Sequence, residues 1–175
     1  MSAIVRDLRE LPTGMPVFID TNIFDLYFRQ KSVTCVEFFG RVQKGEVTAY
    51  VNLLVLTDLN HKLMLAEAYQ KGYINRLNAA HLKDQLEKNR SLMQYLVTHQ
   101  THLEEVLTLV KILPLDSQLL VDTQQERQDY GLMTTDSLHL GSMNRHSPPL
   151  TNLVTYDSDF EHIAGLTIWK PMDVV

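Results

Sequence analysis

Short apolar runs, each suited to a buried β-strand, alternate along this chain with longer segments of helical periodicity. The runs lie at residues 17–19, 47–51, 112–115, 152–155 and 167–169. Helical segments fill the intervals at residues 33–44, 54–70, 75–101, 117–130 and 136–145, with one or two helical turns at 157–163. Apolar strands separated by helices form parallel sheets that are covered on both faces. The chain is therefore predicted to be a three-layer α/β/α protein with a central parallel sheet and an extended helical segment near residues 54–101.

Length and composition indicate one domain that does not cross a membrane. The 175 residues are 45% hydrophobic, which is enough for a sizeable core, and no apolar run approaches the roughly 18 residues that a membrane span needs. Residues 1–16 are predicted to be an N-terminal leader ending in a turn, followed by a single domain over residues 17–175. Charge near the N-terminus argues against a signal peptide, and the lone Cys35 excludes an internal disulfide. These features predict a cytoplasmic protein with Cys35 buried.

Acidic residues stand where four of the predicted elements begin or end. Asp20 follows the first strand, Asp58 lies early in the helix 54–70, Asp136 begins a helix, and Asp157 follows the strand before it. Sites in parallel sheets form at the carboxyl ends of the strands, so Asp20 and Asp157 are expected to lie together. Such carboxylates supply the oxygen ligands that Mg²⁺ and Mn²⁺ prefer, and sites of this kind most often act on phosphate esters. Singly, each aspartate is more simply explained as a helix cap, so the prediction rests on the four together.

Two of these aspartates lie on predicted helices. Asp136 shares a helix face with Leu140 and Met143, which predicts that its carboxylate points toward the edge of the sheet. Asp58 adjoins the apolar run at residues 53–56, where an unpaired buried charge is costly, and is therefore expected to need a partner.

Three motifs carry a resemblance to a known family. They are Val-Phe-Ile-Asp-Thr-Asn at residues 17–22, Thr-Asp-Ser-Leu-His-Leu at 135–140, and Leu-Val-Thr-Tyr-Asp-Ser-Asp-Phe at 153–160. With them the chain resembles PIN-domain proteins over residues 17–171, in the style of the small prokaryotic PIN ribonucleases that include the VapC-like toxins. The resemblance implies the PIN fold and places Asp20, Asp136 and Asp157 on three of the family's acidic metal-site positions.

The resemblance leaves two ligand positions open. The second acidic position of the family is usually Glu on a helix; here it is Asp58, whose shorter side chain is expected to reach an ion through water. The last motif offers both Asp157 and Asp159, of which Asp157 is favoured. Thr21 and Asn22 are candidates for binding the site or the scissile phosphate, and capping of the first helix is an equal alternative.

By this resemblance the chain is a Mg²⁺- or Mn²⁺-dependent endoribonuclease. The carboxylate cluster holds one ion, or two about 4 Å apart, and a metal-activated water attacks the phosphodiester, leaving a 3′-hydroxyl and a 5′-phosphate. The implied partners are RNA, a protein antitoxin and a second copy in a homodimer, with the apolar faces of residues 54–101 as candidate surfaces. The net charge of −5 argues mildly against a general nucleic-acid coat, but the four proposed ligands account for −4 of it.

Two alternative functions stay open. The first is a catalytically idle PIN-fold module that binds RNA or serves as a scaffold, for which the Glu-to-Asp departure at Asp58 is the argument. The second, less favoured, is an aspartyl-phosphate phosphatase of the haloacid-dehalogenase kind with Asp20 as nucleophile. That chemistry needs a second Asp two residues later, where this chain has Asn22.

The other reactive side chains are assigned structural or surface roles. Ser137 is predicted to be a capping hydroxyl, because no His–Asp pair is spaced to activate it. His139 is predicted to be structural. His99 and His102 are predicted to lie on the surface, since no Cys or third His completes a zinc site. Scattered solvated charges are the simplest interpretation of the basic residues nearest the motifs, Arg29, Lys31, Lys62 and Arg145.

Overall fold

The computed structural model describes residues 2–175, which pack into two compact units. The first unit comprises the described residues up to Val55 together with Leu109–Val175, and the second comprises Leu56–Thr108. The residues of each unit thus pack mainly with one another. A compact unit is a separate domain only if it folds by itself, so the single domain over residues 17–175 stays a prediction.

A six-stranded, all-parallel sheet forms the centre of the first unit. Its order is β1-β6-β5-β2-β3-β4, and every neighbouring pair is parallel. The strands are β1 (Ile4–Asp7), β2 (Pro16–Ile19), β3 (Thr48–Asn52), β4 (Val110–Leu113), β5 (Asn152–Val154) and β6 (Thr167–Lys170). The predicted central parallel sheet is confirmed, with β4 beginning two residues before its predicted position.

Strand β1 lies within the segment expected to be a leader. It pairs with β6 at the edge of the sheet, with Ile4 opposite Thr167 and Asp7 opposite Lys170. Its first three residues are exposed and its side chains show no alternation between apolar and polar, so the signal by which a half-buried strand is recognised is absent. The N-terminal segment is therefore part of the sheet.

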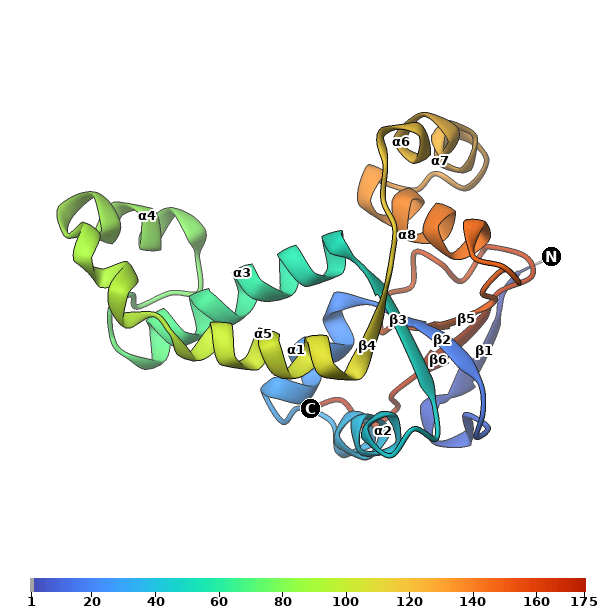
Figure 1. The fold of residues 1–175 in the computed structure, drawn as a ribbon, viewed down its shortest axis with the longest axis horizontal. Helices are drawn as coiled ribbons and strands as arrows, with labels where there is room; N and C mark the ends of the chain where they lie inside the picture. Colours follow the sequence, from blue (N-terminus) through green and yellow to red (C-terminus); the bar gives the residue numbers. More distant parts are fainter. Residues whose placement is uncertain (1) are drawn as a thin grey trace. The chain divides into compact units, whose positions relative to one another are not determined.

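Helices cover both faces of this sheet. One group of helices, α1 and α2, joins β2 to β3, and a second group, α6, α7 and α8, joins β4 to β5. Figure 1 shows α2 and α8 on opposite sides of the strands. The chain moves from β2 through β3 to β4 and then returns to β5 beside β2, and right-handed crossovers place the returning helices on the opposite face. The three-layer α/β/α prediction is confirmed. The helices are α1 (Thr21–Phe28), α2 (Val33–Gln43), α6 (Ser117–Asp122), α7 (Gln124–Tyr130) and α8 (Thr134–Arg145).

Strands β3 and β4 are added on one side of β2, and β5 is added on the other; this reversal of strand order marks the place where ligands bind in open parallel sheets. It brings the carboxyl ends of these two strands side by side, with Ile19 opposite Val154. Cys35, on α2, is buried as the sequence predicts.

The predicted helix 117–130 is divided into α6 and α7 at Thr123. The buried Thr123 hydroxyl donates to the Leu119 carbonyl oxygen at 2.9 Å. At Gly141 of α8, an added Cβ would lie 2.4 Å from Thr123 Cγ2 and 2.9 Å from Leu119 Cδ1. The absence of a side chain at Gly141 therefore lets α6 approach α8 closely.

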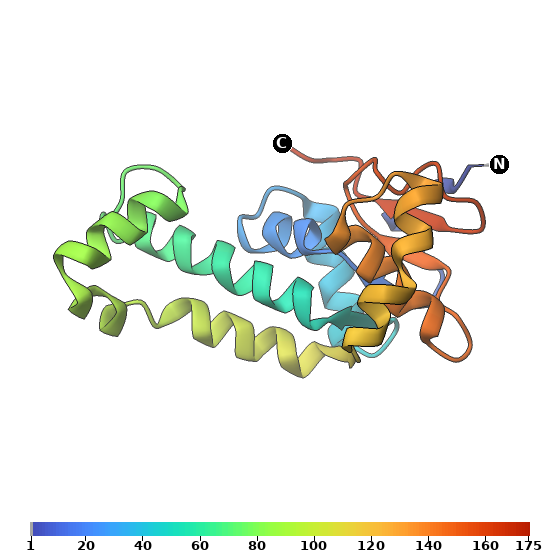
Figure 2. The same ribbon diagram turned by 90° about the horizontal axis from the view of Figure 1, so that it is seen from above.

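The second unit is helical. It is built from α3 (Leu53–Gln70), α4 (Ala79–Lys88), the 3₁₀ helix η2 (Arg90–Tyr95) and α5 (Thr98–Leu109). Figure 2 shows α3 and α5 running side by side. A continuous helix over residues 75–101 is wrong, because Asn78 and Asn89 accept the backbone N–H groups two residues onward and begin new elements there. None of the helices in the described part of the chain has the length and apolar composition of a bilayer span.

A buried carboxylate from α3 caps the N-terminus of α5. Glu67 Oε1 accepts from the backbone N–H of Val97 at 2.9 Å and of Thr98 at 3.0 Å. Glu67 Oε2 accepts from the backbone N–H of His99 at 2.9 Å and lies 2.8 Å from His99 Nδ1, while Lys71 Nζ donates to Oε1 at 2.6 Å. His99 is 9% exposed, so its predicted surface position is wrong. The imidazole is held in this cap.

Candidate metal centre at the carboxyl end of the sheet

Asp20 and Thr155 meet where β2 and β5 end. The Thr155 hydroxyl donates to Asp20 Oδ2 at 2.7 Å. The Asn22 amide nitrogen lies 2.6 Å from the same Asp20 oxygen and 3.0 Å from Thr155 Oγ1. Asp20 Oδ1 accepts the backbone N–H of Thr21 at 2.6 Å, as the cap of α1. These bonds fix the orientation of the Asp20 carboxylate.

The loop after β5 is tied to the same group of side chains. Thr155 Oγ1 accepts the backbone N–H of Asp157 at 3.0 Å, and Asn22 Oδ1 accepts that of Tyr156 at 2.9 Å. Asp157 Oδ1 in turn accepts the backbone N–H of Asp159 at 3.0 Å. The loop that carries two of the predicted ligands is thus anchored to the beginning of α1.

Asp136 belongs to the same electrostatic cluster. It lies in the first turn of α8, which begins at Thr134. Burial, followed by the negative charges of Asp20, Asp157 and Asp159, raises the pKa of Asp136 from 3.8 to about 6. The structure therefore brings together four of the predicted carboxylates, two from the loop after β5, one from β2 and one from α8. Their role as metal ligands stays a prediction.

The donor set of this cluster fits a hard divalent cation. All four side chains offer carboxylate oxygens, which are the ligands that Mg²⁺ and Mn²⁺ prefer. Burial and the three neighbouring negative charges both disfavour the ionised form of Asp136, and a bound cation would favour it. As they stand, no three acidic, histidine or cysteine side chains within residues 2–175 are gathered closely enough to hold an ion. Asp20 Oδ2 accepts from both Asn22 and Thr155, whereas Oδ1 accepts, from the described residues, only the Thr21 N–H and keeps a lone pair with which to bind an ion.

Asp136 is expected to make the metal-free protein less stable at neutral pH than at acidic pH. Its pKa is about 6 in the folded chain and 3.8 without the fold, so between these values the folded state binds more protons and stability falls as the pH rises. Asp136→Asn should remove this dependence and raise the free energy of unfolding at pH 7 by about 1 kcal/mol, after a discount for partial exposure. Urea unfolding of both proteins in EDTA at pH 4 and pH 7 measures it. If the free energies of unfolding of wild type and Asp136→Asn differ by the same amount at pH 4 and pH 7, the raised pKa of Asp136 is contradicted.

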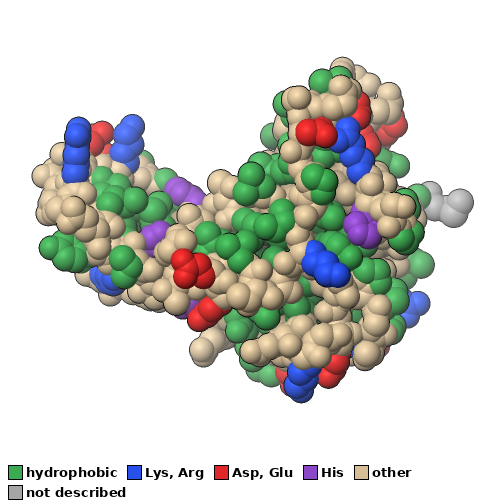
Figure 3. Space-filling view, viewed as in Figure 1, with side chains coloured by type: hydrophobic (Ala, Val, Ile, Leu, Met, Phe, Trp, Pro, Cys, Tyr) green, Lys and Arg blue, Asp and Glu red, His purple; other side chains and the backbone are tan. Residues whose placement is uncertain are grey.

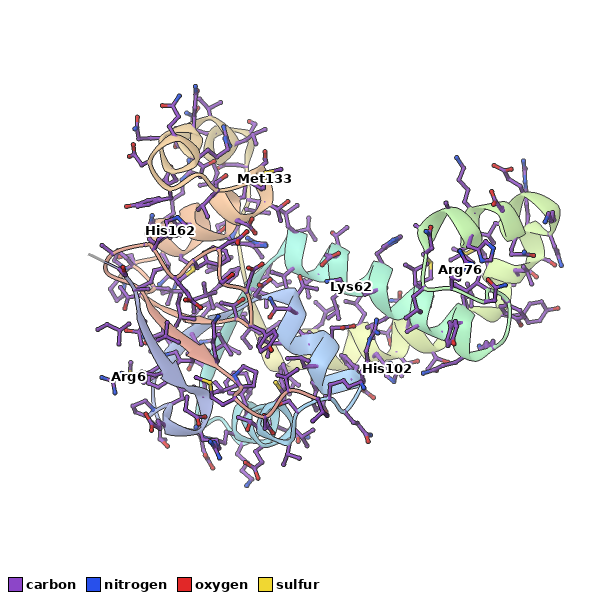
Figure 4. The ribbon with its side chains drawn as sticks, turned by 180° about the vertical axis from the view of Figure 1, so that it is seen from behind. Arg6, Lys62, Arg76, His102, Met133 and His162 are labelled. Carbon is purple, nitrogen blue, oxygen red and sulfur yellow. The ribbon has the colours of Figure 1, made fainter. Side chains whose placement is uncertain are left out.

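Asp58 lies on α3 in the second unit. Its side chain is 47% exposed, and its carboxylate pairs with Lys62 Nζ at 3.0 Å; Figure 4 labels Lys62 on this helix. The expected burial of Asp58 is therefore wrong, whereas the partner that it was expected to need is present in Lys62. The helical period buries the next residue, Leu59, and turns Asp58 to solvent. Membership of Asp58 in the ligand set stays a prediction.

His139 and Ser137, both on α8, are buried among structural partners. His139 Nδ1 lies 3.0 Å from the Asn52 amide nitrogen, which is a donor, so this ring nitrogen accepts. The imidazole also contacts the Phe18 ring, with 5.5 Å between centroids. Ser137 is fully buried and donates to the Thr134 carbonyl oxygen at 2.8 Å, so it neither caps a backbone N–H group nor faces a substrate.

Thr155 was not among the residues predicted from the sequence for this site. Its hydroxyl donates to Asp20 and accepts from Asn22 and from the backbone of Asp157. The sequence feature that could have predicted Thr155 as a site residue is its position, directly after a buried strand and two residues before an aspartate. Hydroxyl side chains there commonly bind nearby backbone N–H groups.

Comparison with known proteins identifies the family. The PIN domain family matches residues 17–166. Among solved structures, the chain is similar to VapBC2 from Rickettsia felis bound to a DNA fragment from its promoter, with 16% identity, a TM-score of 0.55, and coverage of 89% of this chain and 98% of that one. It is also similar to FitAcB from Neisseria gonorrhoeae, with 13% identity, a TM-score of 0.47, and coverage of 89% and 97%. No curated protein matches the chain. The family match spans most of the sequence and all four clustered carboxylates, and the chain belongs to the PIN domain family.

Proposed function

We propose that this chain is a metal-dependent endoribonuclease and the toxin of a toxin–antitoxin pair. PIN domains are generally nucleases, and residues 17–166 of this chain match the PIN domain family. The observation that carries the proposal is the cluster of Asp20, Asp136, Asp157 and Asp159 at the carboxyl end of the sheet, in which the pKa of Asp136 is raised to about 6. Such a cluster suits a cation-assisted reaction on a phosphodiester.

The side chains of the cluster divide into ligands and positioning groups. Asp20, Asp136, Asp157 and Asp159, together with Asp58, are the proposed ligands. A bound Mg²⁺ or Mn²⁺ ion supplies an acidified water and positive charge to offset that of the phosphate. The proposed ligands hold that ion where the substrate phosphate is to lie.

Thr21 and Asn22 support this arrangement from the beginning of α1. Thr21 is buried, and its hydroxyl lies 3.5 Å from the Val55 carbonyl oxygen. Asn22 donates to Asp20 and accepts from the backbone of Tyr156. These contacts support positioning roles for both side chains, with Asn22 aligning the Asp20 carboxylate; the sequence offered binding of the site or of the scissile phosphate as one of two even alternatives.

A protein partner forms part of the proposal. The Rickettsia felis structure is a VapBC2 complex on promoter DNA, and it shares the fold of this chain. We propose a corresponding antitoxin for this chain, a homodimer as its assembled state, and the cytoplasm as the place where it meets RNA.

A metal-rescue assay tests the proposed activity. The purified chain is stripped with EDTA and incubated with single-stranded RNA, duplex RNA and single-stranded DNA, and Mg²⁺ or Mn²⁺ is then restored. We expect RNA cleavage only after restoration, with 5′-phosphate on the products, and a higher melting temperature with Mn²⁺. A folded protein that binds RNA but cleaves none of the substrates with either ion contradicts the enzyme and favours the idle RNA-binding module.

Replacement of Asp58 is expected to weaken Mn²⁺ binding with little effect on the fold. Its pair with Lys62 is exposed, so Asp58→Ala should change the free energy of unfolding by less than about 1 kcal/mol. Asp58→Glu should retain or improve Mn²⁺ affinity, because the longer side chain reaches an ion more directly. Calorimetric titration of wild type and both variants with Mn²⁺ measures this. Unchanged affinity in Asp58→Ala removes Asp58 from the ligand set.

A further inference from the structure

His162 joins the loop that carries Asp157 and Asp159 to the end of α7. Its Nε2 atom lies 2.6 Å from the Tyr130 carbonyl oxygen, which can only accept, so the imidazole donates this hydrogen bond. The two rings also lie near each other, with 6.3 Å between their centroids. Figure 4 labels His162 on the segment between β5 and β6, and Tyr130 lies 32 residues earlier in the chain. The bond therefore connects two segments that meet only through folding.

The loop after β5 is well held between His162 and the nearer aspartate. Residues 158–161 and 160–163 form two overlapping turns, each closed by a bond from its last N–H to its first carbonyl oxygen, at 3.0 Å and 3.2 Å. The first turn contains Asp159, and the second contains His162. Phe160, which belongs to both turns, is buried in the core. A displacement of His162 is therefore passed on to Asp159.

A corresponding route leads from Tyr130 to Asp136. Tyr130 is the last residue of α7, and Arg127 on the same helix places its Nη1 atom 3.4 Å from the Ser137 hydroxyl oxygen. Ser137 is fully buried in the first turn of α8, directly after Asp136. Leu132, in the connection between the two helices, is buried as well. The position of α7 therefore bears on the position of Asp136.

His162 supplies geometry to the site, because a neutral imidazole donates this bond as well as a charged one does. Exposed histidines are not unusual in this protein, and Figure 3 shows histidine side chains at more than one place on the surface. His146 also donates to a backbone carbonyl oxygen, that of Pro148 at 2.7 Å, but only two residues away. What distinguishes His162 is that its bond joins the two segments that carry the clustered carboxylates.

We infer that His162 is a positioning residue: through its bond to Tyr130 it sets the separation between Asp136 on α8 and the two aspartates of the loop after β5. This inference rests on the metal centre of the proposed function. An ion is bound well only where its carboxylate ligands are held at the right separation. Side chains that hold ligands in place commonly change metal affinity without touching the metal.

Two substitutions separate the hydrogen bond from the ring. His162→Gln places a side-chain N–H at a similar distance from the backbone, whereas His162→Phe keeps a ring without a donor. His146→Phe is the matched control, because its bond to Pro148 is local. The proteins are stripped of metal with EDTA, dialysed and titrated with Mn²⁺ by calorimetry. We expect wild type, His162→Gln and His146→Phe to bind alike, and His162→Phe to bind about fivefold more weakly at a similar metal-free melting temperature.

Amide hydrogen exchange in the metal-free proteins tests the connection itself. Exchange at residues 157–163 and 131–136 should become faster in His162→Phe and stay as in wild type in His162→Gln. The same exchange in wild type and His162→Phe overturns the inference. So does a loss of Mn²⁺ affinity that is equally large in His162→Gln and His162→Phe, or in the His146→Phe control.

The failure of this inference and that of the proposed function give different results. Wild-type Mn²⁺ affinity in His162→Phe overturns the positioning role and leaves the metal centre standing. A wild type that binds no Mn²⁺ overturns the metal centre, and with it a role for His162 in placing ligands. Amide exchange then still decides whether His162 holds the two segments together.

Discussion

Asp20→Asn is expected to abolish metal-dependent RNA cleavage, a loss of about 100-fold or more, while the fold is retained. The substitution keeps the shape of the side chain but removes the charge that attracts the ion. Asp20 accepts bonds from Thr21, Asn22 and Thr155, and an amide with one oxygen cannot accept all three, at a cost of about 1–2 kcal/mol. Relief of repulsion from the other carboxylates offsets part of this cost.

Asp25→Asn provides the matched control for this experiment. Asp25 also lies on α1, but its carboxylate is on the surface, paired with Arg29. Cleavage rates are measured with Mg²⁺ and Mn²⁺, and melting temperatures with and without Mn²⁺. We expect Asp25→Asn to match wild type in cleavage and in the Mn²⁺-dependent rise, and Asp20→Asn to lose both. A folded Asp20→Asn protein that cleaves at the wild-type rate would remove Asp20 from the metal centre.

Glu67→Ala is expected to destabilise the second unit by about 3–5 kcal/mol, because it removes a buried carboxylate that accepts from three backbone N–H groups and pairs with the partly exposed Lys71. The change leaves the Val97, Thr98 and His99 N–H groups without their acceptor and Lys71 without its counter-charge. Burial of Glu67 by itself raises its pKa. The bonds from Lys71, His99 and Thr98 outweigh burial and hold the pKa well below the ordinary 4.5. This contribution to stability is therefore present above about pH 4.5 and is lost as the pH falls below that value.

Amide hydrogen exchange locates the effect of Glu67→Ala. Amide exchange should become faster throughout the second unit. The largest change is expected at residues 97–99, at the beginning of α5. Glu104→Ala is the control, because Glu104 is exposed on the same helix and accepts only from the Gln100 side chain. A loss of stability no larger than that of Glu104→Ala would show that the cap contributes little.

The parts of the fold that follow from local patterns were predictable. The apolar run at residues 17–19, followed by Asp20, indicates a buried strand, and parallel strands place their carboxyl ends at one edge. That rule also placed Asp157 near Asp20. Asp136 was predicted to face the same edge from the apolar residues one turn along its helix, and in the structure the charges of Asp20, Asp157 and Asp159 act on its carboxyl group.

The parts that depend on distant partners were not predictable. The cap on α5 comes from Glu67, about thirty residues earlier in the chain, and nothing near residue 98 reveals it. Strand β1 takes its stability from pairing with β6, while its own side chains are largely exposed. The error at Asp58 has another cause: an apolar run was interpreted as a wholly buried turn, although a helix buries only one side.

The hydrogen bond from the Thr155 hydroxyl to Asp20 joins residues that are far apart in the sequence, which affects when the carboxylate cluster can assemble during synthesis. Asp20 emerges from the ribosome early, but its partner Thr155 lies 135 residues later, and β5 must pair with β2 before the two meet. Such long-range pairing forms late, because the intervening chain has to be ordered first. A partly synthesised chain therefore holds no assembled carboxylate cluster. The carboxylate cluster of the proposed ribonuclease is thus assembled only after translation has passed β5 and Thr155.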